Sequence, residues 1–381
     1  MEVVGVGIAA VDVICEVEEY PQGHEGEEPI IATISQISVT DTIERSLRVA
    51  IELDARAVVE EVQVVCSQLG KRCRWIGVST DPAKDSDAAI ALNDLASFGV
   101  DYSLVDTQLS GSFPVSCLDL NYEMVLTQMK MWQFILTSRR TGSRTIVHHR
   151  NMPELSLETF NRALTRYAQT HPADASPVWF HFEGRNMEVV LQMLLLVRST
   201  FRNALISVEI EALRYDWKAA KRLMAAADYV FASKDYLREK LELQTAEAFF
   251  QGILAQQWGA DWTKSVRAFI CPWGTDGVYY LDMSSRSMHH IAAERLDTIV
   301  ESVGAGDTFI GAAIAGLSSP GCSLDRALRL ACLAATTKCT QQGFKLPDNL
   351  VAKWRRELQC DGKSTSFKQS TSTNKMAHQA A

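Results

Sequence analysis

The sequence predicts an α/β protein with a doubly wound, mostly parallel sheet, and three observations carry that prediction. Strands and helices alternate from about residue 178 onward, which is the pattern of parallel strands joined by helical crossovers. The strand segments are short continuous apolar runs, typical of strands buried on both faces. Polar or glycine-rich turns follow these runs, where parallel sheets bind their ligands.

In the first half of the chain, apolar runs and helical spacing predict the elements in order. The continuous apolar run at 3–8 predicts a first strand, and Gly70 and Gly99 are typical helix stops. Ser86 is expected to be the N-cap of the second helix. The expected strands are 3–8, 29–39, 74–78 and 145–149, and the expected helices are 58–69, 86–98 and 156–170.

The second half follows the same rules more regularly. Two short strands around a polar turn, 278–282 and 289–292, predict a hairpin. The other expected strands are 178–182, 205–210, 229–232 and 268–271. The expected helices are 187–199, 216–227, a segment that opens with SKDYLREKL at 233, 304–317 and 324–339.

Four turns of unusual composition follow predicted strands. Because the carboxyl ends of parallel strands meet at one edge of a sheet, these turns should collect there. They read EGRN (183–186), SKD (233–235), WGTDG (273–277) and VGAGD (303–307). The sequence therefore predicts a binding site along this edge.

Composition narrows the function further. A net charge of −8 over 381 residues argues against a nucleic-acid binder, which would carry a basic stripe. The nine cysteines form no CxxC pair, so no metal site is predicted. No apolar run approaches the ~20 residues of a membrane span, and MEVVGVGIAAVDVIC fits a first strand better than a signal peptide. A soluble cytoplasmic protein is expected.

The turn VGAGD has the chemistry of an anion site. A helix that starts at this turn leaves backbone N–H groups without partners and adds about half a positive charge. Gly304, Ala305 and Gly306 would let the backbone approach a phosphate, and Asp307 could accept a proton from an attacking hydroxyl. The alternative is that Asp307 only caps the helix, which would contribute about 1 kcal/mol.

With these residues in view, the chain resembles the ribokinase-like (pfkB) carbohydrate kinases, and within them the ketohexokinases. VGAGDTFIGAAIAGL resembles a signature of that family. Other segments fit in order and spacing: TGSRTIVHHRNMPEL, WFHFEGRN, ISVEIE, YVFASKDY, WGTDGVYY and TKCTQQGF, over about residues 138–344, and VGVGIAAVDVI near the N-terminus.

The resemblance implies a ribokinase-like three-layer α/β/α fold with a mostly parallel central sheet and a small β-strand lid. One kinase domain would span residues 1–345, with lid strands from about 13–40 and 101–150. Residues 346–381, which are polar and low in complexity toward their end, would form a disordered tail. A homodimer through the lid is the implied assembly.

The resemblance also implies the reaction and its residues. ATP with Mg²⁺ would phosphorylate a ketose, with fructose at its 1-hydroxyl as the first expectation and ribose or adenosine as family alternatives. Asp307 would be the general base and Asp12 would bind sugar hydroxyls. The anion hole would be Gly304, Ala305 and Gly306. The nucleotide site would comprise Arg144, Gly274, Thr275, Asp276 and Gly277. Glu183 and Lys234 are weaker candidates, since each could equally carry a loop-end charge or an exposed ion pair.

The chain departs from the family at its sugar site. The family carries GGN with a second Asn three residues on, and these positions read Arg56, Ala57, Val58 and Glu61 here. Asn amides donate and accept hydrogen bonds to hydroxyls, whereas valine cannot and glutamate adds a charge. Two tracts depart from the family pattern: residues 39–62, which include these positions, and residues 118–134. Lineage divergence and wrongly joined exons would each explain both tracts. In the signature itself, Glu301 replaces the usual Asp.

Two rival functions follow from the same sequence. GVGIAA at 5–10 matches the dinucleotide fingerprint G-x-G-x-x-A, but VDVICEVEEYP follows it where a helix should open, so that function is disfavoured. A nucleotide-binding pseudokinase is the stronger rival, because the nucleotide half of the motif set is intact and the GGN motif is missing.

Overall fold

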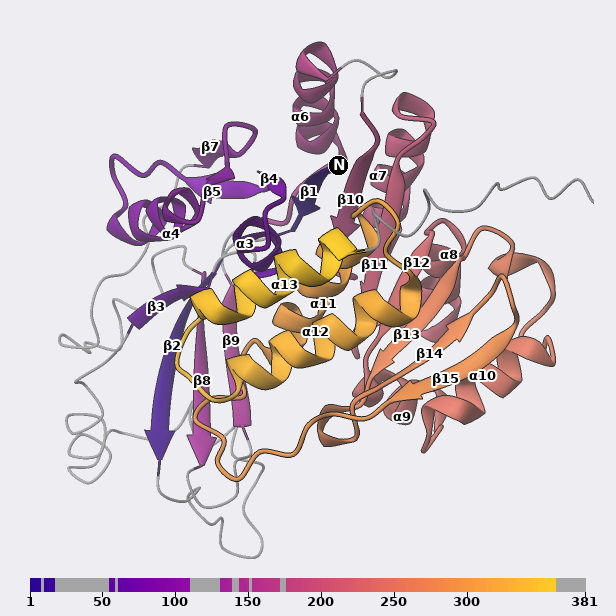
Figure 1. Cartoon of the computed structure of the whole chain (residues 1–381). Coiled ribbons are helices and arrows are strands. Elements are labelled where there is room, and N and C mark those ends of the chain that lie inside the picture. Colours follow the sequence, from indigo (N-terminus) through magenta and orange to yellow (C-terminus); the bar gives the residue numbers. More distant parts are fainter. Residues whose placement is uncertain are drawn as a thin grey trace, which may run out of the picture.

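A nine-stranded, mostly parallel sheet forms the centre of the protein in a computed structural model (Figure 1). The structure describes residues 1–7, 10–17, 55–58, 61–109, 131–138, 144–150, 153–171 and 176–360. All strands of this sheet run parallel except β14, which is antiparallel to both of its neighbours. In spatial order they are β15 (Ser287–Ile291), β14 (Val278–Asp282), β13 (Ala268–Pro272), β12 (Tyr229–Ala232), β11 (Leu205–Ile210), β10 (Val178–Phe182), β1 (Glu2–Val6), β4 (Arg72–Ile76) and β6 (Val100–Asp101).

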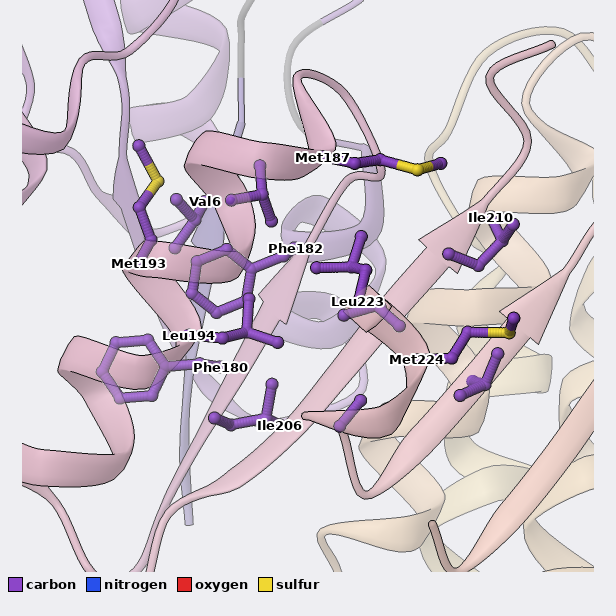
Figure 2. Close-up of a cluster of buried hydrophobic side chains, with 14 of the residues drawn as sticks. Val6, Phe180, Phe182, Met187, Met193, Leu194, Ile206, Ile210, Leu223 and Met224 are labelled. Carbon is purple, nitrogen blue, oxygen red and sulfur yellow. The ribbon is translucent and has the colours of Figure 1, made fainter. Parts of the chain in front are cut away.

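Helices cover both faces of this sheet and give three layers. Successive side chains of a strand point to opposite faces. In β10, Phe180 and Phe182 therefore pack into one hydrophobic core while Trp179 packs into the other. Figure 2 shows the first core, where side chains of β10 and β11 meet the helices that follow them. The predicted α/β/α architecture is confirmed.

The two cores divide the helices between the two faces. The first core is covered by α6 (Leu157–Thr170), α7 (Met187–Thr200), α8 (Trp217–Ala225), α9 (Lys234–Leu241) and α10 (Ala246–Leu254). The second is covered by α3 (Glu61–Gln68), α4 (Ser86–Ser97), α11 (Ala305–Leu317), α12 (Leu324–Lys338) and α13 (Asp348–Cys360). Short 3-10 turns lie at η1 (Asp261–Thr263) and η2 (Gly274–Asp276). No helix in the described ranges is long and apolar enough to cross a membrane.

Side-chain caps fix where several helices begin. A Ser, Thr or Asp before the first turn accepts a hydrogen bond from the N–H three residues on, and so satisfies a group that has no partner in the helix. The caps of this kind are Ser156, Asp216, Ser233, Thr245 and Ser323. The expected cap at Ser86 is wrong: the Asp85 carboxylate accepts from Ala88 N–H at 3.2 Å, and Ser86 is the first helical residue.

A separate four-stranded sheet is built mainly from the segments that were predicted to form the lid. Its strand order is β3 (Ala55–Val58), β2 (Ala10–Val17), β8 (Met131–Ser138) and β9 (Arg144–Arg150). Three of these strands come from the segments expected to form the lid, but β3 does not: residues 55–58 were expected to lead into a helix. Residues 18–40, 110–130 and 139–143 of the expected lid lie outside the described residues. A small sheet pairs β5 (Val78–Thr80) with β7 (Asp106–Leu109).

The disordered tail was predicted to begin at residue 346, which is too early in the chain. Residues 348–360 form α13, which packs on the second core through Leu350 and Trp354, both buried. An apolar stripe at helical spacing was present in DNLVAKWRREL, and the polar composition that follows it concealed the signal. Residues 361–381 lie outside the described part of the chain.

Asp228 directly precedes β12 and links that strand to α7, to β11 and to the residue that precedes β13. Its carboxylate accepts hydrogen bonds from Arg198 (2.6 Å), Arg267 (3.2 Å) and the N–H of Ile206 (2.8 Å). Asp228→Ala is expected to lower the free energy of unfolding by about 2–3 kcal/mol, because a buried N–H and a half-buried guanidinium lose their partner. Urea denaturation measures the change. Asp261→Ala, which breaks only the exposed pair with Lys264, is the control and should change stability by less than about 0.5 kcal/mol. Equal losses in the two variants would contradict the structural role of Asp228.

Candidate functional site

The strand order places a crevice at the carboxyl ends of β1 and β10. From β1 the sheet continues to β4 and β6 on one side, and from β10 to β11, β12 and β13 on the other. Chains that leave neighbouring strands in opposite directions open a crevice, and ligands of doubly wound sheets bind there. Glu183, the first residue after β10, lies at this point, with its N–H 3.5 Å from the carbonyl oxygen of Val6.

The glycine turn at 304–307 opens α11 and provides an anion site. Gly304 is the N-cap, with a φ of 72°, which favours glycine because other residues are strained there. The N–H of Ala305 lies 3.3 Å from the carbonyl oxygen of Ser302, and the next amides have no acceptor within the helix. A Cβ added at Gly306 would meet nothing within 4 Å, so the turn is open on that side.

Asp307 is the third residue of α11 rather than its cap. The N-cap is Gly304, and no side chain makes a capping hydrogen bond there. The interpretation of Asp307 as the helix cap is therefore wrong. Its carboxylate is partly exposed, and within the described residues no hydrogen bond engages it. A partly exposed carboxylate next to free amides and the helix dipole is free to receive a proton from a bound ligand.

Several carboxylates, Asp307 among them, gather around Glu209. Glu183 follows β10, Glu209 lies near the end of β11, and Glu211 follows it. Burial, reinforced by the charges of Glu211, Asp307 and Glu183, raises the pKa of the Glu209 carboxyl well above its ordinary range. Arg185 opposes this shift and pairs with Glu183 at 2.5 Å.

The WGTDG turn follows β13, two strands beyond β11, and would form the second half of the candidate site. Gly274 and Gly277 have φ values of 63° and 95° and bracket η2. The Lys234 ammonium, at the start of α9, lies 4.0 Å from where a Cβ on Gly274 would stand. The Arg238 guanidinium lies 5.5 Å from the centre of the Trp273 ring. The turn thus combines exposed backbone, an adjacent ammonium and an aromatic ring.

His290 holds this turn from the edge strand β15. Its Nε2–H donates to the carbonyl oxygen of Asp276 at 2.6 Å, because a carbonyl can only accept. Its ring stacks on Tyr279, with centroids 4.2 Å apart. Tyr279 also meets Trp273 edge to face. The histidine therefore fixes the backbone of a turn that was predicted to contact a nucleotide.

Strand pairing brings Asp12 next to the positions that replace the GGN motif. Asp12 in β2 is the Cα partner of Arg56 in β3 on one side and of Gln133 in β8 on the other. The positions that replace GGN therefore lie directly across from the strand that carries Asp12. Arg144 begins β9 and pairs with Thr137. The side chains of Asp12, Arg56 and Arg144 lie outside the described part of the structure.

Glu61, the charged replacement for the second Asn, lies behind the glycine turn. It is 7% exposed, and a Cβ added at Gly304 would overlap both the Glu61 carboxylate and the Phe344 ring. Its helix, α3, packs closely on α11: Cys66 donates to the carbonyl oxygen of Gly311 at 3.0 Å, and a Cβ there would come within 2.7 Å of the Val62 carbonyl oxygen. Glu61 is therefore part of the packing behind the turn.

Sequence reasoning found the glycine turns but missed residues that support them. Glu209 and Glu211 lie in ISVEIE, which was noted as a strand and for its resemblance, and Arg185 lies in EGRN, one of the four turns predicted to border the site, but none of the three was given a role. The signal for the two glutamates was an acidic residue at or just after a strand end. His290 was interpreted only as a strand residue, and no sequence signal distinguishes it from His289. Asp307 and the WGTDG residues lie where the four-turn prediction placed them, except that no strand directly precedes VGAGD.

Comparison with known proteins agrees with this arrangement. Residues 193–349 match the model of the pfkB family carbohydrate kinases. Mouse ketohexokinase is 28% identical over 351 residues, which cover 90% of this chain and 97% of that protein. Among solved structures, the adenosine kinase from Sinorhizobium meliloti superposes with a TM-score of 0.65 at 15% identity, covering 93% of this chain and 99% of the other. Arabidopsis thaliana ribokinase, complexed with ribose and ATP, superposes with a TM-score of 0.62 at 16% identity, covering 93% and 98%.

At 15–16% identity the solved structures establish only the fold of the chain, which is ribokinase-like. The family match covers α7 to the start of α13 and therefore includes β11, the WGTDG turn and the VGAGD turn. Residues 193–349 are thus similar to the pfkB carbohydrate kinases, and the similarity to a ketohexokinase extends over most of the chain. The strand order and the two glycine turns agree with that similarity.

Proposed function

We propose that the protein transfers the γ-phosphoryl group of ATP to a sugar hydroxyl, with fructose at its 1-hydroxyl as the first candidate acceptor. The observation that carries this proposal is the position of Asp307. Its carboxylate stands in the first turn of α11, beside the open amides of the 304–307 turn, at the sheet edge where ligands of this fold bind. The similarity to a ketohexokinase supports a ketose, while ribose and adenosine remain the family alternatives.

The proposed step needs one proton acceptor and one anion site. The Asp307 carboxylate accepts the proton of the sugar hydroxyl as the hydroxyl oxygen bonds to the γ-phosphorus. The bond from that phosphorus to the oxygen it shares with the β-phosphate breaks, and ADP leaves with the electron pair. The amide of Gly306 and the α11 dipole stabilise charge on the transferred group. The products are ADP, the sugar phosphate and a proton.

The WGTDG half fits the nucleotide. Gly274 and Gly277 bring backbone close to a ligand, and Lys234 offers an ammonium to phosphate oxygens. Thr275, Asp276 and, from β9, Arg144 are proposed as further contacts. Mg²⁺ would enter with ATP and neutralise phosphate charge. Among the described residues no group of three or more His, Cys, Asp or Glu side chains could hold a metal ion, so phosphate oxygens and water would supply most ligands.

A second candidate function rests on the sugar half. Arg56, Ala57 and Val58, where the family has GGN, pair with Asp12, Val11 and Ala10 of β2, and Glu61 lies behind the turn instead of offering an amide. A sugar hydroxyl that is buried without its amide partner weakens binding by about 1–3 kcal/mol, or roughly 5- to 150-fold. A pseudokinase that binds ATP without transferring phosphate is therefore the alternative.

One assay separates these candidates. ADP release is measured with purified protein, ATP and Mg²⁺ over a panel of fructose, other ketoses, ribose and adenosine, with a no-acceptor control. Binding of ATP is measured in parallel by calorimetry. Release that depends on fructose supports the proposal. Release only with ribose or adenosine shifts the acceptor class, and ATP binding with no release for any acceptor establishes the pseudokinase.

Removing His290 tests the nucleotide half. His290→Ala is expected to weaken ATP binding by about three- to tenfold, because the Asp276 carbonyl loses the hydrogen bond that fixes the turn. The kcat should change little, since the histidine does not reach the acceptor side. His289→Ala is the matched control: its ring stacks on Tyr280 and its Nε2 contacts Ser287, so it leaves the turn untouched. Equal effects of the two variants would refute the role of His290.

Three wider expectations complete the proposal. A homodimer would form through the sheet β3-β2-β8-β9, which the resemblance identifies with the lid. The kinase domain would span residues 1–345, to which the structure adds the helix α13. The protein would act in the cytoplasm on a small-molecule sugar, with no nucleic-acid or membrane partner.

A further inference from the structure

Lys338, in the last turn of α12, carries its charge into the protein interior. Its side chain is 0% exposed, and its ammonium lies 2.5 Å from the Glu301 carboxylate and 3.4 Å from the Glu301 carbonyl oxygen. A buried charge is tolerated only when it is paired and hydrogen-bonded, and an apolar pair of similar volume would often be at least as stable. The pair is therefore poorly explained as a source of stability alone.

The partner carboxylate ties together segments on both sides of the glycine turn. Glu301 also accepts a hydrogen bond from the N–H of Gly343 at 2.8 Å. The N–H groups of Val300 and Glu301 donate to the carbonyl oxygen of Cys339, at 2.8 and 3.3 Å. The segment that leads into the turn is thus attached to the end of α12 and to the loop that follows it.

Phe344 transmits this arrangement to the turn itself. The Lys338 ammonium lies 5.3 Å from the centre of the Phe344 ring, within cation–π range. The same ring fills the space behind Gly304 that a Cβ would need. Gln68 holds Phe344 from the other side: its amide donates to the Phe344 carbonyl oxygen at 2.8 Å and accepts from the N–H of Leu346 at 2.7 Å. The ring therefore has little freedom to move away from the turn.

We propose that Lys338 is a positioning residue for the anion-binding turn. Its buried ammonium, paired with Glu301, holds the 300–303 segment and the Phe344 ring against Gly304. This support fixes the direction of the N–H groups at the start of α11. These groups stabilise charge on a bound phosphate only when they point at it. Lys338 acts through Glu301 and Phe344 and does not touch the substrate. The effect of Lys338 on catalysis rests on the proposed phosphoryl transfer, whereas its effect on the position of the turn does not.

The test compares Lys338→Met, Glu301→Gln and the double variant. Hydrogen exchange is followed by mass spectrometry on peptides that cover residues 301–308 and on peptides from β1 and β10. In Lys338→Met, exchange at 301–308 should rise by about tenfold or more while β1 and β10 keep their protection, since local opening is independent of global unfolding. Glu301→Gln keeps its shape and its bond from Gly343, and should show a smaller rise at the same peptides. The double variant should be less perturbed than Lys338→Met, because it contains no buried carboxylate that has lost its counter-charge.

Kinetics supplies the second readout. On the active acceptor, kcat should fall by about 10- to 100-fold in Lys338→Met while the KM for ATP stays within about threefold, because the loss is confined to the transition state. Lys264→Met, in an exposed pair with Asp261, is the control and should change neither quantity. Unchanged exchange at 301–308, or exchange raised equally in β1 and β10, would overturn the positioning role. If Lys338→Met does not fold, Glu301→Gln decides by the same criteria. A wild-type protein without activity on any acceptor would refute the kinase proposal, while the exchange pattern would still decide this one.

Discussion

Asp307→Asn is expected to lower kcat for the active acceptor by about 10³-fold, because asparagine keeps the shape of the side chain but cannot accept the hydroxyl proton. The structure makes this expectation specific. Asp307 is not the N-cap of α11, and no hydrogen bond within the described residues depends on its carboxylate. The fold and its stability should therefore survive the change. The measurement is ADP release at saturating ATP and acceptor, together with thermal unfolding.

The control for Asp307→Asn is another acid in the first turn of a helix. Asp348 opens α13 and is exposed, so Asp348→Asn removes a comparable favourable contact with a helix dipole. It should leave kcat unchanged and reduce stability by less than about 1 kcal/mol. ATP affinity should stay within about threefold in Asp307→Asn, since the nucleotide turn is built from other residues. If Asp307→Asn retains most of the wild-type kcat, Asp307 is not the base.

Gly304→Ala is expected to have the second largest effect, with kcat reduced by about 10²-fold and the free energy of unfolding by about 2–3 kcal/mol. Two separate penalties combine. A φ of 72° strains any residue with a Cβ, and the added methyl group would overlap the Phe344 ring and the Glu61 carboxylate. Because Phe344 is held by Gln68, the neighbours cannot yield freely and the turn must move. ADP release and urea denaturation measure both losses.

Two glycines elsewhere separate the causes. Gly321 has a similar φ of 76° but nothing within 4 Å of an added Cβ, so Gly321→Ala should show only backbone strain, about 1 kcal/mol, and normal kcat. Gly306→Ala adds a methyl group into open space with ordinary backbone geometry, so it should fold normally. Any loss of kcat in Gly306→Ala then reports crowding of the bound ligand. A Gly304→Ala variant no worse than Gly321→Ala would show that the packing behind the turn is unimportant.

Much of the fold could be predicted because its strands lie in the interior of a parallel sheet. Burial on both faces favours mostly apolar runs such as VWFHF and LISVEI, and helical crossovers require amphipathic segments between them. The hairpin of β14 and β15 was likewise predicted from a polar turn between two short strands. Errors fell where a local signal was weak, at the strand β3 and the helix α13. Both are stabilised by partners distant in sequence, respectively β2 and the second core.

For the site, the sequence by itself determined the turns. VGAGD and WGTDG supply glycine at 304, 274 and 277, where φ is positive, and the place of WGTDG directly after the buried strand β13 specifies the edge on which that turn lies. The tertiary structure alone decided what stands around them. These surroundings come from strands, helices and loops that approach one another only when the helices pack on the sheet. They comprise Glu209, Glu61, Phe344 and the Lys338–Glu301 pair. A sequence states what each residue can do, whereas the fate of a buried charge depends on which distant groups surround it.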